Sequence, residues 1–376
     1  MMDDPYYWLE TGDEFYAAVL KEIGQAKESV RLETYIFMDG EPGDTVRKAL
    51  VGAAQRGVRV SVLVDAFGSF ELPGDYWARL IAAGGACRVF NPLDLGRIAF
   101  RDHRKLLVCD RRTAFVSGFN ISRHEAGDGV TRGWRDLGLR LTGPVVRDLA
   151  VSFDRMFAMA DFKHRRLPRL RLPLRSRHLQ QQGGSPILLN GGPGRAVNPI
   201  KRMLLRDLQQ AHSIHIVSAY FLPTRRILRA LIQAARRGLK VTLITAGVTD
   251  VPLARYAGRS LYNRLLRAGV RIFEYEPQIL HSKLIVAGDV AYVGSANLDI
   301  RSLTINYELL VRIEERGLAQ EAERIFARHL PHCRPIGRAS WRRSRKWWER
   351  VMERLAHLLL ARVDVLFARR QLSRLR

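Results

Sequence analysis

The sequence is poor in cysteine. Cys87, Cys109 and Cys333 are the only three among 376 residues, and no pair of them stands at metal-ligand or redox spacing. This argues against a disulfide framework and a cysteine-based zinc site, and it favours a reducing cytoplasm. No other cluster of His, Cys and carboxylate residues shows metal-ligand spacing along the chain, so we expect neither a metal nor a cofactor.

Long apolar runs are also missing. No uninterrupted apolar stretch approaches the roughly 18 residues of a membrane-spanning helix. The first residues, Met1 to Trp8, are acidic and lack the basic-then-apolar order of a signal peptide. We therefore expect any membrane contact to be peripheral.

Acidic residues are scarce relative to basic ones. The chain has 62 Lys and Arg against 37 Asp and Glu, which gives a net charge of +25 and points to a polyanionic partner, either nucleic acid or an anionic membrane. Residues 163–177 contain seven basic residues and no acidic one, with prolines between them, and predict a basic linker over residues 161–184. Residues 334–376 contain thirteen basic and three acidic residues.

The C-terminal segment, residues 334–376, predicts a basic amphipathic helix. Its apolar residues recur at helical spacing, with arginines beside them and three tryptophans at the start. This pattern is typical of a helix that lies in the interface of an anionic membrane, although a terminal helix packed on the core would also explain it. The apolar stripe consists of Trp348, Val351, Met352, Leu355, Leu358, Leu359, Val363 and Leu366, preceded by Trp341 and Trp347.

The chain repeats itself. Residues 49–60 and 230–241 share a helix-to-strand pattern built around Gly57 and Gly238, at an offset of 181 residues. A His-x-Lys sequence recurs at His103 and His281, at an offset of 178 residues. Strands that alternate with helices predict an α/β sandwich in each half, with largely parallel strands. We expect a first half over residues 1–160 and a second half over residues 185–333.

Polar residues recur together with the apolar ones. His103 and Lys105, like His281 and Lys283, are two positions apart, so in a strand they point to the same face. Two such pairs facing each other can carry out transfer at phosphorus, in which one His attacks, the other protonates the leaving alkoxide, and the lysines stabilise the phosphoryl oxygens. We expect one active site at the interface of the halves, with His103 as the nucleophile.

Further candidates follow each His-x-Lys sequence. Asn120 follows the second strand of the first half, while Ser295 and Asn297 follow that of the second half. Their amide and hydroxyl groups can donate to an anion. Asp136 and Glu308, at similar distances downstream, are candidates for the carboxylates that fix the histidine tautomers.

These residues resemble the phospholipase D superfamily, whose motif is His-x-Lys-x4-Asp followed by a small-residue turn and Asn. Asp110 is the motif aspartate of the first half. Five further segments are similar to bacterial cardiolipin synthases of the short form, which lacks the N-terminal membrane-spanning helices of the longer ones. They are residues 35–37, 101–108, 134–136, 220–223 and 297–302.

The resemblance implies two homologous sandwiches packed about a pseudo-two-fold axis. It also implies phosphatidyl transfer to phosphatidylglycerol through a phosphohistidine, without metal. The expected partners are an anionic phospholipid substrate and the membrane surface, contacted through the C-terminal helix and the linker. The expected location is peripheral, at the cytoplasmic face of the bacterial inner membrane.

The second motif departs from the pattern. Gly288 stands where the motif has Asp, and Asn297 follows its His by 16 residues where Asn120 follows by 17. We expect Asp289 to take over the role in the turn. Three alternatives stay open: a phospholipase D-type hydrolase, a nuclease of the same superfamily, and a catalytically impaired lipid-binding remnant. The Trp-rich tail favours lipid over nucleic acid.

Overall fold

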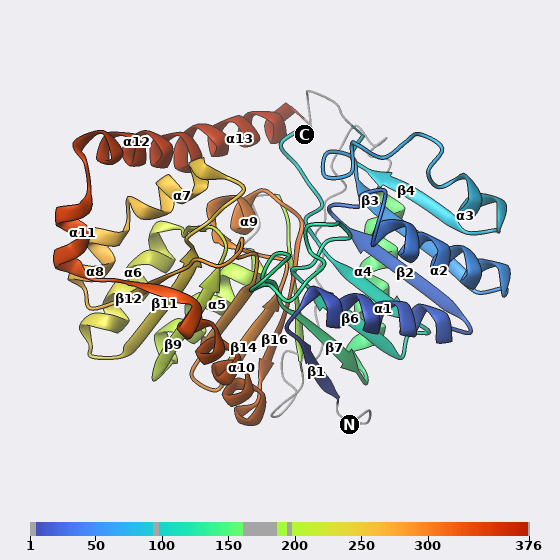
Figure 1. The fold of residues 1–376 in the computed structure, drawn as a ribbon, viewed down its shortest axis with the longest axis horizontal. Coiled ribbons are helices and arrows are strands. Elements are labelled where there is room, and N and C mark those ends of the chain that lie inside the picture. The colour runs from blue at the N-terminus through green and yellow to red at the C-terminus, as the bar shows by residue number, and fades with distance from the viewer. Residues whose placement is uncertain (1–4, 93–97, 161–185, 194–197, 375–376) are drawn as a thin grey trace.

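The computed structural model describes residues 5–92, 98–160, 186–193 and 198–374. Two α/β halves lie side by side, the first drawn in blue to green and the second in yellow to orange (Figure 1). The predicted basic linker, residues 161–184, lies outside the described residues.

The first half is built on a seven-stranded sheet with four helices. Its elements, in chain order, are β1 (Tyr6–Leu9), α1 (Gly12–Gln25), β2 (Ser29–Thr34), α2 (Gly43–Gln55), β3 (Arg59–Asp65), α3 (Ala78–Ala82), β4 (Ala86–Phe90), β5 (Leu106–Cys109), β6 (Thr113–Ser117), β7 (Gly138–Thr142) and α4 (Val145–Met159).

The second half is built on an eight-stranded sheet, with a small two-stranded sheet formed by β10 and β15. Its elements are β8 (Ile187–Gly191), α5 (Pro199–Gln210), β9 (Ser213–Ser218), β10 (Phe221–Leu222), α6 (Arg225–Arg236), β11 (Lys240–Ala246), α7 (Pro252–Arg259), α8 (Tyr262–Arg267), β12 (Arg271–Tyr275), β13 (Lys283–Ala287), β14 (Val290–Gly294), β15 (Leu298–Asp299), α9 (Ile300–Thr304), β16 (Glu308–Glu314), α10 (Arg316–His329), a 3-10 turn (Leu330–His332) and β17 (Cys333–Ile336).

Both sheets have the same strand order. The first runs β1-β7-β6-β5-β2-β3-β4, and the second runs β8-β16-β14-β13-β9-β11-β12, with β17 added at the β12 edge. This confirms the predicted α/β class and the repeat. The helices of the helix-to-strand repeat end in the same way in both halves. Gly57 and Gly238 have φ angles of 86° and 88°, a left-handed conformation that favours glycine.

The expectation of largely parallel strands is wrong. In each main sheet, three of the described strands pair in parallel, β2-β3-β4 and β9-β11-β12, and the other pairings are antiparallel. For two of these antiparallel pairs the reason is the length of the connection. β5 and β6 are joined by three residues and β13 and β14 by two, which is too short for the crossover that parallel strands need.

The two halves share a hydrophobic core. One buried cluster contains Phe153 of α4, Ile325 of α10, and residues of both sheets such as Leu106 and Leu284. The outer faces have separate cores, covered by α1 to α3 in the first half and by α5, α6 and α8 in the second. The shared cluster fixes the interface at which the site is assembled.

The C-terminal segment begins as a strand and not as a helix. β17 pairs antiparallel with β12, and then α11 (Arg338–Ser344), α12 (Trp347–Leu358), a π-helical turn (Leu359–Val363) and α13 (Asp364–Arg374) follow. α12 packs on α7, and α12 and α13 run along one edge of the molecule toward the first half (Figure 1). No helix among the described residues is long and apolar enough to cross a membrane.

The predicted apolar stripe of this segment faces outward. Its eight residues, from Trp348 to Leu366, are 41% to 57% exposed, and Trp347 is 76% exposed. Trp341, expected at the start of the stripe, is instead buried against Tyr262 at a ring separation of 4.9 Å. The inward side of the same helices contributes Ala356 and Ala368 to buried clusters. The segment is therefore packed on the core and also presents an apolar surface.

Candidate active site

The two predicted histidines lie at the junction of the halves, each just before a strand. His103 and Lys105 precede β5, and His281 precedes β13, which begins at Lys283. Each His is fixed by a backbone hydrogen bond to the other half: His103 N–H donates to the Tyr307 carbonyl at 3.0 Å, and His281 N–H donates to the Arg135 carbonyl at 2.7 Å. The site is therefore built across the interface.

Each candidate carboxylate contacts the histidine of the other half. Asp136 of the first half lies 2.5 Å from Nδ1 of His281, and Glu308 of the second half lies 3.2 Å from Nδ1 of His103. Both carboxylates are fully buried. A carboxylate that accepts the Nδ1 proton leaves Nε2 free to attack phosphorus or to transfer a proton.

The two lysines are buried and close to the histidines. Lys105 Nζ donates to the carbonyl of His103 at 2.8 Å, and Lys283 Nζ donates to that of His281 and lies 4.0 Å from Asp136. Burial, reinforced by the charge of Lys283, lowers the pKa of Lys105 to about 7. Burial, together with the lysine charges, also lowers the pKa of both histidines. A bound phosphate would supply the negative charge that favours the protonated lysines.

The predicted amide and hydroxyl donors are also brought into the site. Asn120 and Asn297 line the same cavity as the histidines. Asn120 Nδ2 donates to Glu125 at 3.0 Å, while Asn297 is buried and its amide oxygen has no partner among the described residues. Ser295 Oγ donates to Glu308 at 2.5 Å, so it holds the carboxylate that faces His103.

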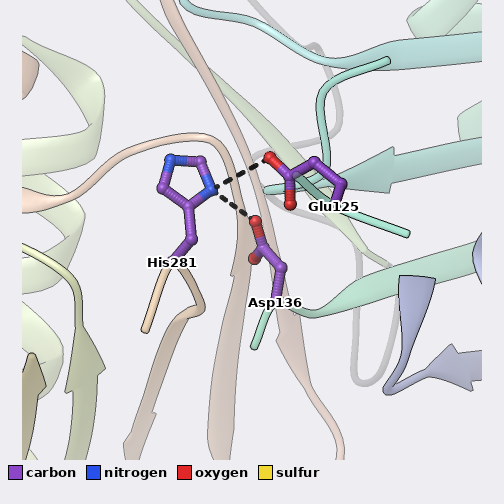
Figure 2. Close-up of side chains that lie close together, drawn as sticks. All are labelled: Glu125, Asp136 and His281. Carbon is purple, nitrogen blue, oxygen red and sulfur yellow. Dashed lines mark hydrogen bonds and ion pairs between the residues drawn. The ribbon is translucent and has the colours of Figure 1, made fainter. Parts of the chain in front are cut away.

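Glu125 was not predicted, yet it lies in the same cluster. Its carboxylate is fully buried, 3.6 Å from Nδ1 of His281 and beside Asp136 (Figure 2). Burial, and then the negative charge of Asp136, raise the pKa of Glu125 to about 8. The repeat could not reveal it, because the residue five positions after Asn297 is Ser302 where the first half has Glu125.

Two predicted residues, Asp110 and Asp289, lie in turns away from the cluster of side chains around the histidines. Asp110 caps the β5–β6 turn, where its carboxylate accepts from the backbone N–H groups of residues 27, 28 and 29 at 2.7–2.9 Å. It is seven residues from His103, about 20 Å along an extended chain. Asp289 is exposed in the two-residue turn between β13 and β14. Gly288 N–H donates to the Ser213 carbonyl just as Asp110 N–H donates to that of Ser29, so this position belongs to the turn in both halves.

One cluster has the composition of a metal site, contrary to the expectation from spacing. Ligand atoms of Glu125, Asp136 and His281 lie within 4.8 Å of one another, although the residues are far apart in the sequence. The fit is poor: Nδ1 of His281 and the Asp136 oxygen are 2.5 Å apart and already share a hydrogen bond. Ligands at about 2.0–2.2 Å from a tetrahedral ion would be separated by more than 3 Å. We therefore derive no step through a metal.

The histidines open into a cavity of about 650 Å³. Its polar end is formed by the histidines and asparagines, and two arginines, Arg101 and Arg301, stand on its wall. The other walls are largely apolar. They include Phe67, Ile98, Leu222, Val251 and Ile300, together with Leu360 and Phe367 of the C-terminal segment.

Two repeated α/β halves with a His-x-Lys pair from each at their interface define a protein of the phospholipase D-like class. The family described as "Cardiolipin synthase, PLD-like domain" matches residues 19–156 and 204–330. The chain belongs to this family.

Individual relatives agree with this assignment. Cardiolipin synthase B of Escherichia coli (strain K12) is 37% identical over 320 residues, which cover 83% of this chain and 77% of the relative. Cardiolipin synthase of Geobacillus thermodenitrificans is 34% identical over 361 residues, which cover 93% and 71%.

Among solved structures, phosphatidylserine synthase of Haemophilus influenzae Rd KW20 is similar in fold. The TM-score is 0.74 at 15% identity, and the match covers 98% of this chain and 96% of that one. Polyphosphate kinase of Porphyromonas gingivalis matches with a TM-score of 0.59 at 17% identity, over 89% of this chain and 49% of the kinase. At these identities the likeness establishes the fold alone.

Proposed function

We propose that the protein transfers a phosphatidyl group from one phospholipid to a glycerol hydroxyl of phosphatidylglycerol and so forms cardiolipin. The observation that carries this proposal is the pair of carboxylate-oriented histidines at one end of an apolar cavity, in a chain of the cardiolipin synthase family. An apolar cavity suits a lipid, whereas a nuclease would need an open basic groove beside the histidines.

The proposed reaction has two displacements at one phosphorus atom. Nε2 of one His attacks the phosphorus of the donor lipid, and the bond from phosphorus to the head-group oxygen breaks while the other His protonates that oxygen. The hydroxyl of phosphatidylglycerol then attacks the phosphohistidine and gives its proton to the second His, and the bond between phosphorus and nitrogen breaks. The lysines and asparagines stabilise the phosphoryl oxygens in both steps.

We propose His103 as the nucleophile and His281 as the acid. Asp136 lies 2.5 Å from Nδ1 of His281, and the charges of Lys283 and His281 hold the pKa of Asp136 below its usual value despite its burial. The negative charge of Asp136 favours the protonated imidazole that an acid requires. His103 has one carboxylate at 3.2 Å. Trapping the phosphoenzyme and mapping the modified residue tests the assignment, and modification of His281 would reverse it.

The altered second motif is compatible with activity. Gly288 and Asp289 occupy the turn at the end of β13 that is far from His281 and Lys283. The position that lacks the motif carboxylate is therefore outside the cavity. This favours an active enzyme over a binding remnant.

The experiment that tests the function is incubation of the purified protein with labelled phosphatidylglycerol in vesicles and, separately, with DNA. We expect cardiolipin and glycerol as products and intact DNA. Phosphatidic acid as the sole lipid product would indicate a hydrolase, and DNA cleavage would indicate a nuclease. The His103→Ala variant purified in parallel excludes a contaminating activity.

We propose further that α12 and α13 dock on the anionic membrane, at the cytoplasmic face of the inner membrane. The exposed apolar stripe from Trp348 to Leu366 would enter the interface, and neighbouring arginines would attract the head groups, at about 1 kcal/mol per basic residue. Because Trp341 and Ala356 belong to the core, removal of the whole segment would disturb the fold, and point substitutions are the better test.

The double variant Leu355→Ser, Leu366→Ser removes apolar surface from the stripe without touching the core. We expect it to sediment less with phosphatidylglycerol vesicles than the wild type. Ile81→Ser is the matched control, because Ile81 is 58% exposed on α3 and Leu366 is 57% exposed. Equal losses in the two variants, or equal wild-type binding to neutral and anionic vesicles at low salt, would contradict the proposal.

A further inference from the structure

The C-terminal segment contributes an acidic group to the wall of the active-site cavity. Asp364, the first residue of α13, lines the cavity together with the histidines. Both of its oxygens accept from Nη1 of Arg301, at 2.7 and 2.9 Å, and Nη2 of Arg301 donates to the Ala99 carbonyl at 2.9 Å. An arginine of the cavity wall is thus neutralised by a carboxylate from the tail.

The two cavity-wall arginines differ in how they are held. Arg101 is 3% exposed, and its guanidinium bonds to Asp65 and to the Ile98 carbonyl, both in the first half. Arg301 has a side chain that is 38% exposed, and its carboxylate partner comes from the tail. Arg101 is therefore held within the first half, whereas the carboxylate that holds Arg301 comes from the C-terminal segment and the pair is partly exposed.

Arg301 stands near the reacting groups without touching them. The ring of Tyr35 lies 5.0 Å from that of His103, between centroids. Tyr35, His103 and Arg301 line the same cavity. The positive charge of Arg301 also opposes the rise that burial causes in the pKa of Tyr35.

The proposed reaction requires a second place for an anion. The acceptor lipid carries its own phosphodiester, separated by a three-carbon glycerol from the hydroxyl that attacks. When that hydroxyl meets the phosphorus held by the histidines, the acceptor's own phosphate must lie elsewhere in the cavity. A guanidinium donates to carboxylate and phosphate oxygens in the same way, so an Arg–Asp pair marks a place where phosphate also fits.

We propose that Arg301 binds the phosphate of the acceptor phospholipid, and that Asp364 of α13 occupies this place until the acceptor displaces it. The inference rests on the proposed function, since only transfer between two lipids needs a second phosphate site. Leu360 and Phe367, beside Asp364 on the cavity wall, give the acceptor's apolar portion a surface to contact. The tail thereby competes with the acceptor for one arginine.

The experiment compares two acceptors at the same histidines. In cardiolipin formation the acceptor is phosphatidylglycerol. In the second assay the acceptor is labelled glycerol, which has the hydroxyl but no phosphate, and the product measured is labelled phosphatidylglycerol. We expect Arg301→Gln to lower the ratio of cardiolipin formation to glycerol incorporation at least about tenfold, the scale of one charge-assisted hydrogen bond. Arg301→Lys, which keeps the charge, should recover part of this ratio.

Asp364→Asn should change the ratio in the opposite direction, because it frees Arg301 for the acceptor. An ion pair that only holds the tail in place would instead make both variants change the ratio in the same direction. Arg328→Gln is the matched control, because Arg328 pairs with Glu10 outside the cavity and both Glu10 and Asp364 are 22% exposed. Thermal denaturation of each variant confirms that it is folded.

The possible outcomes separate this inference from the function on which it rests. If the wild type forms cardiolipin but both variants shift the ratio in the same direction, or neither shifts it, Arg301 is not the acceptor site. If the wild type incorporates glycerol but forms no cardiolipin, the proposed function itself fails, and the acceptor site fails with it.

Discussion

The two histidines occupy sites of the same backbone geometry but different electrostatics. Each lies just before a strand that has the same place in its sheet, β5 or β13, and each pairs with a carboxylate of the other half. His281, however, faces Asp136 and Glu125. Among the described residues His103 faces one carboxylate, that of Glu308, which is held by the hydroxyl of Ser295. The two halves therefore share a strand order, while their different carboxylates make the two imidazoles chemically distinct.

The largest expected effect tests whether both sites are needed. His103→Ala and His281→Ala should each lower the rate of cardiolipin formation by more than about 10³-fold, since a nucleophile and an acid cannot replace one another within a cycle. Rates measured with labelled phosphatidylglycerol decide this. A variant that kept wild-type turnover would break the two-histidine mechanism.

The next prediction compares the carboxylates. Burial alone would raise the pKa of Asp136, but the charges of Lys283 and His281 hold it below its usual value. For Glu308 burial is the stronger influence, and it raises the pKa to about 7 in spite of the nearby charge of Lys105. Asp136→Asn should therefore lower kcat by about 10²–10⁴-fold at every pH from 6 to 8. Glu308→Gln should have little effect at pH 6, where Glu308 is protonated, and a larger one at pH 8.

The pH profiles of kcat for both variants measure this difference. Two parallel profiles would show that the carboxylates are equivalent and would remove the distinction between the two sites.

A smaller effect is expected on stability. The folded-state pKa of Glu125 is about 8, above its ordinary value of 4.5, so between these values the folded protein binds a proton that the unfolded chain does not. Its contribution to the free energy of unfolding therefore falls as pH rises through this window. Because glutamine does not titrate, the Glu125→Gln variant does not lose this part of its free energy of unfolding. The free energy of unfolding of the variant minus that of the wild type should therefore increase by at least about 1 kcal/mol from pH 5 to pH 8.

Urea denaturation at the two pH values measures the change. Glu321→Gln, at an exposed position on α10, serves as the control. A constant difference between Glu125→Gln and the wild type across the range would mean that Glu125 is charged throughout.

The smallest effect is expected from chelation. We expect EDTA to leave the rate of cardiolipin formation unchanged, because Asp136 is already hydrogen-bonded to His281 and Lys283 supplies positive charge 4.0 Å away. Loss of activity on chelation and its return with a divalent ion would contradict this. It would turn Glu125, Asp136 and His281 into a metal site, and the asymmetry between the halves would acquire another meaning.

Local patterns predicted much of the frame. The repeated Gly57 and Gly238 mark matching helix ends, and the recurrence of His103 and His281 predicted one site shared by two halves. Pairing within the sheets was less predictable, because periodicity identifies a strand without saying which neighbour it joins. The turn between β5 and β6 makes that pair antiparallel, and Asp110, the motif aspartate of the first half, belongs to this turn.

The sequence by itself determined the chemistry of this protein: two His-x-Lys pairs, two candidate carboxylates and an apolar basic tail are matters of residue type and spacing. Only the tertiary structure decided which groups meet. It paired Asp136 of the first half with His281 of the second, and Glu308 of the second half with His103 of the first. It also placed Glu125 beside His281 and Asp364 beside Arg301. These contacts join residues separated by 63 to 205 positions, and packing of the shared core, which local spacing does not encode, sets their distances.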